Sequence, residues 1–288
     1  MSSLRSSLPL LAAVVVTLAS CSEPADSASS PTDTGPTQTK GCDKDSLRTV
    51  EDGRLTIGTS DPAYAPWFVD NDPGNGQGFE SGMGYRLAQH LGYDPADVRW
   101  VRVPMGEAMA RGPKSFDLAL VEASITPKRR AAVDFSTPYH AVRQAVVTYE
   151  GSPIAGKHSV AELKGARLAA AQGTTSYDAI TRVVAPTQAP VAYPTVTEAG
   201  NALAAHQVDG LVTDVPTAIY LSTAVVDDAS VLGELPAGSD EQVGAVLAKS
   251  SSLTQCVSTA VRQLKADGTL DRLGEHWLSS SKEVPTLS

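Results

Sequence analysis

The feature that most constrains this sequence is the repeated alternation of strand-like and helix-like segments between residues 55 and 277. Strand-like segments occur at 55–58, 98–103, 116–121, 144–148, 168–171, 210–213 and 243–247. Helical spacing of apolar residues predicts helices at 83–91, 106–110, 198–206, 253–264 and 270–277. Because repeated strand–helix units place successive strands side by side, this order predicts an α/β fold with mainly parallel sheets.

The first twenty residues have the features of an export signal. Arg5 precedes an apolar run, Leu8–Leu18, that is too short to span a bilayer. The segment Leu18-Ala19-Ser20-Cys21 follows, and it resembles the lipobox of bacterial lipoproteins, in which the Cys is acylated and becomes the new N-terminus. We therefore expect residues 1–20 to be a lipoprotein signal peptide and Cys21 to be lipidated. The alternative is an ordinary signal peptide with a chance Cys.

Residues 22–41 consist mostly of Ser, Thr, Pro, Asp, Gly and Ala, without any aromatic or branched aliphatic residue. Nothing there can form a core, so residues 21–42 are expected to be the lipidated N-terminus and a disordered linker. A coil of this length reaches about 25 Å on average. No later segment is long and apolar enough to be transmembrane, so the acyl chains are the expected membrane anchor.

The sequence is acidic, with a formal charge of −9; removal of Arg5 with residues 1–20 gives −9 − 1 = −10. With five His and no basic run, it is a poor nucleic-acid binder. If Cys21 is lipidated, Cys42 and Cys256 remain, and an exported protein keeps disulfides, so we expect these two to pair. No Cys-x-x-Cys or His-x-x-x-His spacing suggests a metal, and no cofactor is expected.

Several motifs along the body stand in a fixed order: Ile57–Thr59 with Tyr64–Phe68, Gly78–Glu80, Phe116–Ala119, Ser124–Arg129, Asp134–Tyr139, Gln172–Thr175, Val208–Gly210 with Asp214, and Ala266–Leu270 with Trp277. In this order and spacing they resemble the extracellular solute-binding proteins (family 3) of ABC transporters for polar amino acids. The resemblance extends from about Leu55 to Trp277 and is specific because it rests on many separate motifs.

The resemblance implies a two-lobe, type II periplasmic-binding-protein fold whose lobes are joined by two hinge strands. Residues 43–146 and 243–288 are expected to form lobe 1, and residues 147–242 lobe 2. The implied protein is a monomer and not an enzyme. It is held by its lipid anchor on the outer face of the cell membrane, captures a free amino acid and delivers it to the permease of an ABC importer.

The resemblance also implies the residues that bind the amino acid. Burying its carboxylate and ammonium requires opposite charges or several hydrogen bonds. The hydroxyl of Ser124 and the planar fork of Arg129 are expected to hold the carboxylate, and Asp214 the ammonium. Backbone N–H groups of the second lobe, where a loop enters a helix, add donors for an anion at Thr174, Thr175 and Ser176.

Four further positions bear on the ligand's side chain. Tyr64 is expected to form a pocket wall, and Asp61 stands where relatives that bind basic amino acids meet the distal cation. Met105 replaces the aromatic residue of most relatives, and Glu122 is an unusual acid at a position whose backbone usually accepts from the ligand ammonium. This excess of acid favours a cationic or neutral polar amino acid over an acidic one.

Each assignment has an alternative. Arg129 could be one of three solvated helix charges with its neighbours Lys128 and Arg130, and Asp214 could simply cap the helix that follows it. A periplasmic cyclohexadienyl (prephenate or arogenate) dehydratase on the same fold is the alternative function, with Glu122 as its unusual acid–base candidate. A receptor's sensor module would require a transmembrane or kinase segment, which does not follow.

Overall fold

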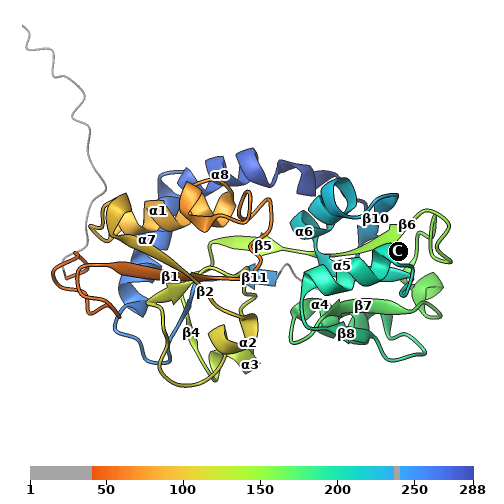
Figure 1. Cartoon of the computed structure of the whole chain (residues 1–288), viewed down its shortest axis with the longest axis horizontal. Helices are drawn as coiled ribbons and strands as arrows, with labels where there is room; N and C mark the ends of the chain where they lie inside the picture. Colours follow the sequence, from red (N-terminus) through yellow and green to blue (C-terminus); the bar gives the residue numbers. More distant parts are fainter. Residues whose placement is uncertain (1–40, 237–240) are drawn as a thin grey trace, which may run out of the picture. The chain divides into compact units, whose positions relative to one another are not determined.

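In a computed structural model, residues 41–236 and 241–288 are described, and they fold into two α/β lobes that are each built on a five-stranded sheet (Figure 1). The predicted signal peptide (1–20), Cys21 and the linker up to residue 40 lie outside the described residues. Within the part of the chain that is described, none of the helices is both long and apolar enough to cross a bilayer.

The sheet of the first lobe has the order β2-β1-β3-β12-β4. Its strands are β1 (Leu55–Thr59), β2 (Val98–Arg102), β3 (Leu118–Ala119), β4 (Asp134–Phe135) and β12 (Val246–Leu247). The strands β2, β1 and β3 run parallel because helical segments connect them, whereas β12 comes back from the other lobe and runs antiparallel to β3 and β4.

Helices cover both faces of this sheet. On one face α1 (Phe79–His90), α7 (Thr254–Ala266) and α8 (Thr269–Trp277) pack against each other and share a core with Leu118. On the other face the short helices α2 (Met105–Ala108) and α3 (Pro127–Arg130) lie next to a core around Ala119 (Figure 1). The neighbours Leu118 and Ala119 reach opposite cores because successive strand residues point to opposite faces.

The sheet of the second lobe has the order β10-β6-β9-β7-β8. Its strands are β6 (Gln144–Tyr149), β7 (Leu168–Ala171), β8 (Val191–Tyr193), β9 (Gly210–Asp214) and β10 (Ala229–Glu234). The pairs β9–β7 and β7–β8 are parallel, and β6 pairs antiparallel with β9 and β10. One face packs on α5 (Val196–Ala204) and α6 (Val215–Tyr220), and the other on α4 (Thr175–Ala179), which continues as a π-helix over Ile180–Val184.

Two antiparallel strands, β5 (His140–Val142) and β11 (Glu241–Val243), form the hinge between the lobes (Figure 1). The first crossing lies before the boundary that we expected after residue 146, since β6 begins at Gln144 and belongs wholly to the second sheet. The apolar residues of β6 form one continuous strand. Its side chains enter both cores of the second lobe, with Val147 on one face of the sheet and Val146 on the other.

The end of the chain also departs from the expected assignment of residues 243–288 to one lobe. Helices α7 and α8 pack on α1 of the first lobe, but residues 284–288 lie against the second. The N–H of Leu287 donates to the Glu234 carbonyl at 2.8 Å, and the N–H of Ser288 donates to His158 at 2.9 Å. Leu287 is buried over Gly233, which has no side chain to occupy that space.

The predicted disulfide between Cys42 and Cys256 is confirmed, with Cα atoms 5.3 Å apart. It attaches the start of the described body to α7 of the first lobe. The predicted strand 243–247 is divided, because Gly244 and Ala245 separate β11 in the hinge from β12 in the sheet. Trp67, beside the Pro-rich loop, is fully buried against Phe79 and is a core residue.

Candidate functional site

One cavity of about 350 Å³ lies between the lobes and is lined by all ten residues that the sequence singled out as ligand contacts. They are Asp61, Tyr64, Met105, Glu122, Ser124, Arg129, Thr174, Thr175, Ser176 and Asp214. The first six come from the first lobe and the last four from the second. We call this space the interlobe cavity.

The loop after β1 reaches across to the second lobe. The hydroxyl of Tyr64 is hydrogen-bonded to that of Thr197 at the start of α5, and its ring lies 6.4 Å from the ring of Tyr220 on α6. Burial raises the pKa of Tyr64, which keeps its hydroxyl neutral. Asp61, three residues earlier on the same loop, is exposed at the rim, and Met105 at the start of α2 is half-buried.

Arg129 spans the two lobes. Thr126 caps α3 by accepting from the Arg129 N–H at 3.2 Å, which fixes the backbone of that turn. The Arg129 guanidinium donates from Nη1 to the Ser124 carbonyl at 2.8 Å and from Nη2 to the Gly173 carbonyl at 3.1 Å. Burial lowers the pKa of Arg129. The side chain is half-buried and directed at the cavity, whereas Lys128 and Arg130 are exposed.

The second lobe contributes the turn that opens α4. Thr174 is its N-cap: the hydroxyl accepts from the Tyr177 N–H at 3.3 Å and donates to the Ala171 carbonyl at 2.7 Å. The hydroxyl of Thr175 is buried and lies 3.2 Å from the Ser124 hydroxyl of the other lobe. Ser176 is also buried at this turn. Thr174 therefore both caps α4 and lines the cavity, and a loop that enters a helix in this way presents backbone N–H groups that can bind an anion.

Asp214 ends β9 and caps α6, as its alternative interpretation predicts. Its carboxylate accepts from the Thr217 N–H at 3.0 Å and from the Thr213 hydroxyl at 3.3 Å. The same carboxylate lines the interlobe cavity, so the cap orients it rather than removing it from the site. Burial raises the pKa of Asp214, and a cation in the cavity would counter that effect.

Glu122 is held in a conformation that few residues with a side chain adopt, with φ of 53°. Its backbone N–H donates to Oε1 of Glu80 at 2.9 Å, and the Tyr139 hydroxyl also bonds to that oxygen. Burial raises the pKa of Glu80 to about 7 and raises that of Glu122 well above its ordinary value, with Asp214 adding to both shifts. Burial and mutual repulsion thus favour the neutral forms of these acids, and a positive charge in the cavity would favour their ionised forms.

The sequence did not single out three polar residues at or next to the site: Gln144 lines the interlobe cavity, whereas Glu80 and Glu241 contact residues that line it. Glu80 belongs to a motif of the resemblance, but its contact with Glu122 spans 42 positions. Gln144 was interpreted only as the start of a strand, and Glu241 of β11 carried no local signal. The segment Thr195-Val196-Thr197-Glu198 has the pattern of a capping box, which the structure contains, and this signal could have located the start of α5.

Within residues 41–236 and 241–288, no group of His, Cys, Asp or Glu is arranged to hold a metal ion. The interlobe cavity is lined by one guanidinium, of Arg129, by the carboxyl groups of Asp61, Glu122 and Asp214, and by several hydroxyls. Such a lining complements a small organic molecule that bears charges of both signs.

Residues 55–280 match the bacterial extracellular solute-binding proteins, family 3. The chain is similar to the L-cystine-binding protein TcyJ of Escherichia coli (strain K12), with 26% identity over 233 residues, 80% of this chain and 84% of that protein. It is also 26% identical over 250 residues to the glutamine-binding protein GlnH of Bacillus subtilis (strain 168), which covers 84% of this chain and 86% of that protein.

Among solved structures, an ancestral arginine-binding protein bound to glutamine superposes with a TM-score of 0.66 and 27% identity, over 79% of this chain and 98% of that one. The expected two-lobe periplasmic-binding-protein fold is confirmed. The relatives from Escherichia coli and Bacillus subtilis are both named as binding proteins. With the family match extending over most of its length, the chain belongs to the bacterial extracellular solute-binding proteins of family 3.

Proposed function

We propose that this protein captures a free amino acid in the interlobe cavity and delivers it to the permease of an ABC importer. The observation that carries the proposal is the opposition of charges across one small cavity, with Arg129 on the first lobe and Asp214 on the second. An α-carboxylate and an α-ammonium need such a pair of partners. The relatives named for binding cystine, glutamine and arginine support the same class of ligand.

The two ends of the ligand receive different partners. Arg129 keeps N–H donors beyond the two that bond to backbone carbonyls, because a guanidinium has five. These donors and the N–H groups at the start of α4 serve the carboxylate. The ammonium pairs with Asp214, which the α6 cap already holds in place. Because the partners lie on separate lobes, the site is complete only when the lobes are closed.

The side chain of the ligand is proposed to be cationic or neutral and polar. Glu122 and Asp61 add two carboxylates to the lining besides Asp214, so a second positive charge would find a partner. An acidic side chain would meet repulsion from the same groups. Met105 offers a flexible apolar contact in place of an aromatic face.

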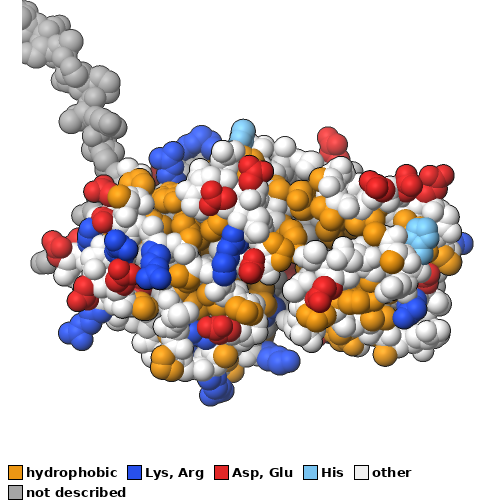
Figure 2. All heavy atoms as spheres, viewed as in Figure 1, with side chains coloured by type: hydrophobic (Ala, Val, Ile, Leu, Met, Phe, Trp, Pro, Cys, Tyr) orange, Lys and Arg blue, Asp and Glu red, His pale blue; other side chains and the backbone are white. Residues whose placement is uncertain are grey.

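We also propose that Cys21 is lipidated and that the protein acts as a monomer at the outer face of the membrane. The lipobox supports the anchor. The monomer is supported by the surface of the described residues, where Val50 and Val225 are the exposed large hydrophobic side chains. On the face drawn in Figure 2, hydrophobic side chains are interspersed with polar and charged groups. Replacing Cys21 with Ser should release the protein from membranes, and unchanged membrane association would contradict the anchor.

A thermal-shift panel of the twenty common amino acids tests the function directly. We expect cationic or neutral polar amino acids to raise the melting temperature, and mass spectrometry of small molecules that co-purify should identify a ligand of this kind. Stabilisation by glutamate or aspartate alone would contradict the proposed side-chain preference. A protein that responds to no amino acid would contradict the proposed ligand class.

A further inference from the structure

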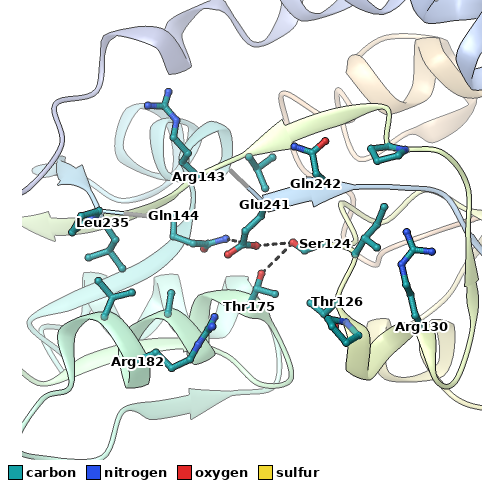
Figure 3. Close-up of a pocket in the computed structure, with 17 residues that line it drawn as sticks. Ser124, Thr126, Arg130, Arg143, Gln144, Thr175, Arg182, Leu235, Glu241 and Gln242 are labelled. Atoms are coloured by element: carbon teal, nitrogen blue, oxygen red, sulfur yellow. Dashed lines mark hydrogen bonds between the residues drawn. The ribbon is translucent and has the colours of Figure 1, made fainter. Parts of the chain in front are cut away.

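A chain of hydrogen bonds connects the second lobe, the first lobe and the hinge (Figure 3). The hydroxyl of Ser124 donates to Oε2 of Glu241 at 2.8 Å, and the Thr175 hydroxyl lies 3.2 Å from that of Ser124. Gln144 donates from Nε2 to the same Glu241 oxygen at 3.3 Å. Ser124 belongs to the first lobe, Thr175 and Gln144 to the second, and Glu241 to the hinge strand β11.

The direction of these bonds follows from chemistry. A carboxylate only accepts hydrogen bonds, so the single proton of the Ser124 hydroxyl points to Glu241. Ser124 must then accept from Thr175 in their mutual contact. Both hydroxyl protons are therefore used, and neither is free for another carboxylate.

The backbone keeps Glu241 in this place. Ser124 forms a β-bridge with Val243, and the N–H of Ile125 donates to the Gln242 carbonyl at 2.7 Å. Along β11 the side chain of Glu241 points to Ser124 while that of Gln242 points to the opposite side (Figure 3). Ser124 and Thr175 are buried, which shields their bonds from water and strengthens them.

Glu241 also acts on the guanidinium that the ligand needs. Burial lowers the pKa of Arg129, and the largest effect in the opposite direction is the negative charge of Glu241. Glu241 therefore accepts from the Ser124 hydroxyl and favours the charged form of the Arg129 guanidinium, the two groups that the proposed ligand carboxylate needs.

We propose that Glu241 is an internal substitute for the ligand carboxylate. Glu241 accepts from the Ser124 hydroxyl, which in turn accepts from Thr175, so that both lobes are tied to the hinge. A bound amino acid would take the Ser124 hydroxyl from Glu241. Glu241 thus sets how tightly the protein binds. The competition rests on the proposed function, because it requires an amino acid in the interlobe cavity; the tie between the lobes does not.

Two substitutions separate the parts of this role. Glu241→Gln keeps the length of the side chain and an oxygen that accepts from Ser124, but it removes the negative charge. Glu241→Ala removes charge and acceptor together. Since the bond and the charge compete with the ligand carboxylate for Ser124 and Arg129, both variants should bind the amino acid more tightly, by about tenfold for Glu241→Ala. Gln242→Ala, on the same strand but facing away, is the matched control and should bind like the wild type.

Isothermal titration with the amino acid that most stabilises the wild type measures the competition. Tighter binding by both Glu241 variants supports it, and unchanged or weaker binding overturns it. If the wild type binds no amino acid, the proposed function fails and the competition fails with it.

Small-angle scattering of the ligand-free proteins measures the tie without any ligand. Glu241→Ala should show a larger radius of gyration than the wild type and Gln242→Ala, because the lobes separate more often. An unchanged radius overturns the tie. Circular dichroism shows whether Glu241→Ala is folded. If it is not, the near-isosteric Glu241→Gln tests the competition through its affinity and the tie through its radius of gyration, which should increase less.

Discussion

The backbone N–H of Glu122 donates to the carboxylate of Glu80 over 2.9 Å, which joins a fully buried acid to the wall of the interlobe cavity. This bond holds the left-handed backbone of Glu122, and the Tyr139 hydroxyl supports the same oxygen. Because the pKa of Glu80 is raised to about 7, mainly by burial, its proton links the site to pH.

Stability should therefore fall as the pH rises from about 5 to 7. Unfolded Glu80 loses its proton near its ordinary pKa, whereas the folded protein retains it until about 7, so the folded state binds more protons in this window. The loss amounts to roughly 3 kcal/mol at most for a shift of this size. Glu80→Gln should flatten the dependence in denaturant unfolding at several pH values. Glu275→Gln, an exposed acid on α8, should leave the wild-type slope intact, and an equal slope in both variants would argue against Glu80.

Replacing Arg129 with Ala should abolish binding while the fold persists. Removal of one partner of a desolvated charge pair weakens binding by roughly 2–5 kcal/mol. A micromolar site would then be undetectable in ordinary titrations. Arg129→Lys keeps the charge but loses the bonds to the Ser124 and Gly173 carbonyls, so it should bind weakly. Calorimetry on Arg130→Ala, the exposed neighbour, serves as the control. Wild-type affinity in Arg129→Ala would mean that Arg129 only joins the Ser124 and Gly173 carbonyls.

Asp214 has two roles that substitutions can separate. Asp214→Asn retains an oxygen for the Thr217 N–H but loses the charge, whereas Asp214→Ala loses both. We expect binding to disappear in both variants, and only the Ala variant should lose about 1 kcal/mol of stability through the missing cap. Titration and thermal unfolding of the pair measure the two effects. Normal affinity in Asp214→Asn would mean that Asp214 is only a cap.

The contact of Leu287 with the second lobe should contribute strongly to its stability. Leu287 is 3% exposed and packs in the core beside Val146 and Val212. Leu287→Ala should reduce the free energy of unfolding by roughly 2–5 kcal/mol. Hydrogen exchange should accelerate in β6 and β10 before it does in β1. The exposed neighbour Thr286→Ala provides the control, and equal exchange in the two variants would show that the contact is dispensable.

Loss of the Cys42–Cys256 disulfide should destabilise the first lobe. The bond closes a loop with a sequence separation of 214, for which chain entropy gives a contribution of about 5 kcal/mol. Cys42→Ser and Cys256→Ser should therefore melt at a lower temperature than the wild type, and reductant should lower the wild type to the same value. A melting temperature that reductant does not change would indicate that the bond contributes little.

Local sequence patterns were sufficient to predict many of the helices and strands of this protein. Strand-like segments located β1, β2, β6, β7 and β9 but missed β8 and β10, and helical spacing located α1, α7 and α8. The resemblance, which rests on motifs spread over the whole body, singled out ten residues that are all among those lining the interlobe cavity. The helices and strands can be predicted in this way because the pattern of each arises from neighbours within one turn or one strand.

Contacts between distant segments were decided only by the tertiary structure. Ser124 and Glu241 are 117 positions apart and meet because Ser124 forms a β-bridge with Val243 of β11. This register cannot be predicted from the local sequence of either segment. The same holds for Leu287, which leaves the lobe of α8 because a space over Gly233 accepts it. The sequence by itself determined many of the elements and the residue types at the site, while packing across the hinge decided which of those residues meet.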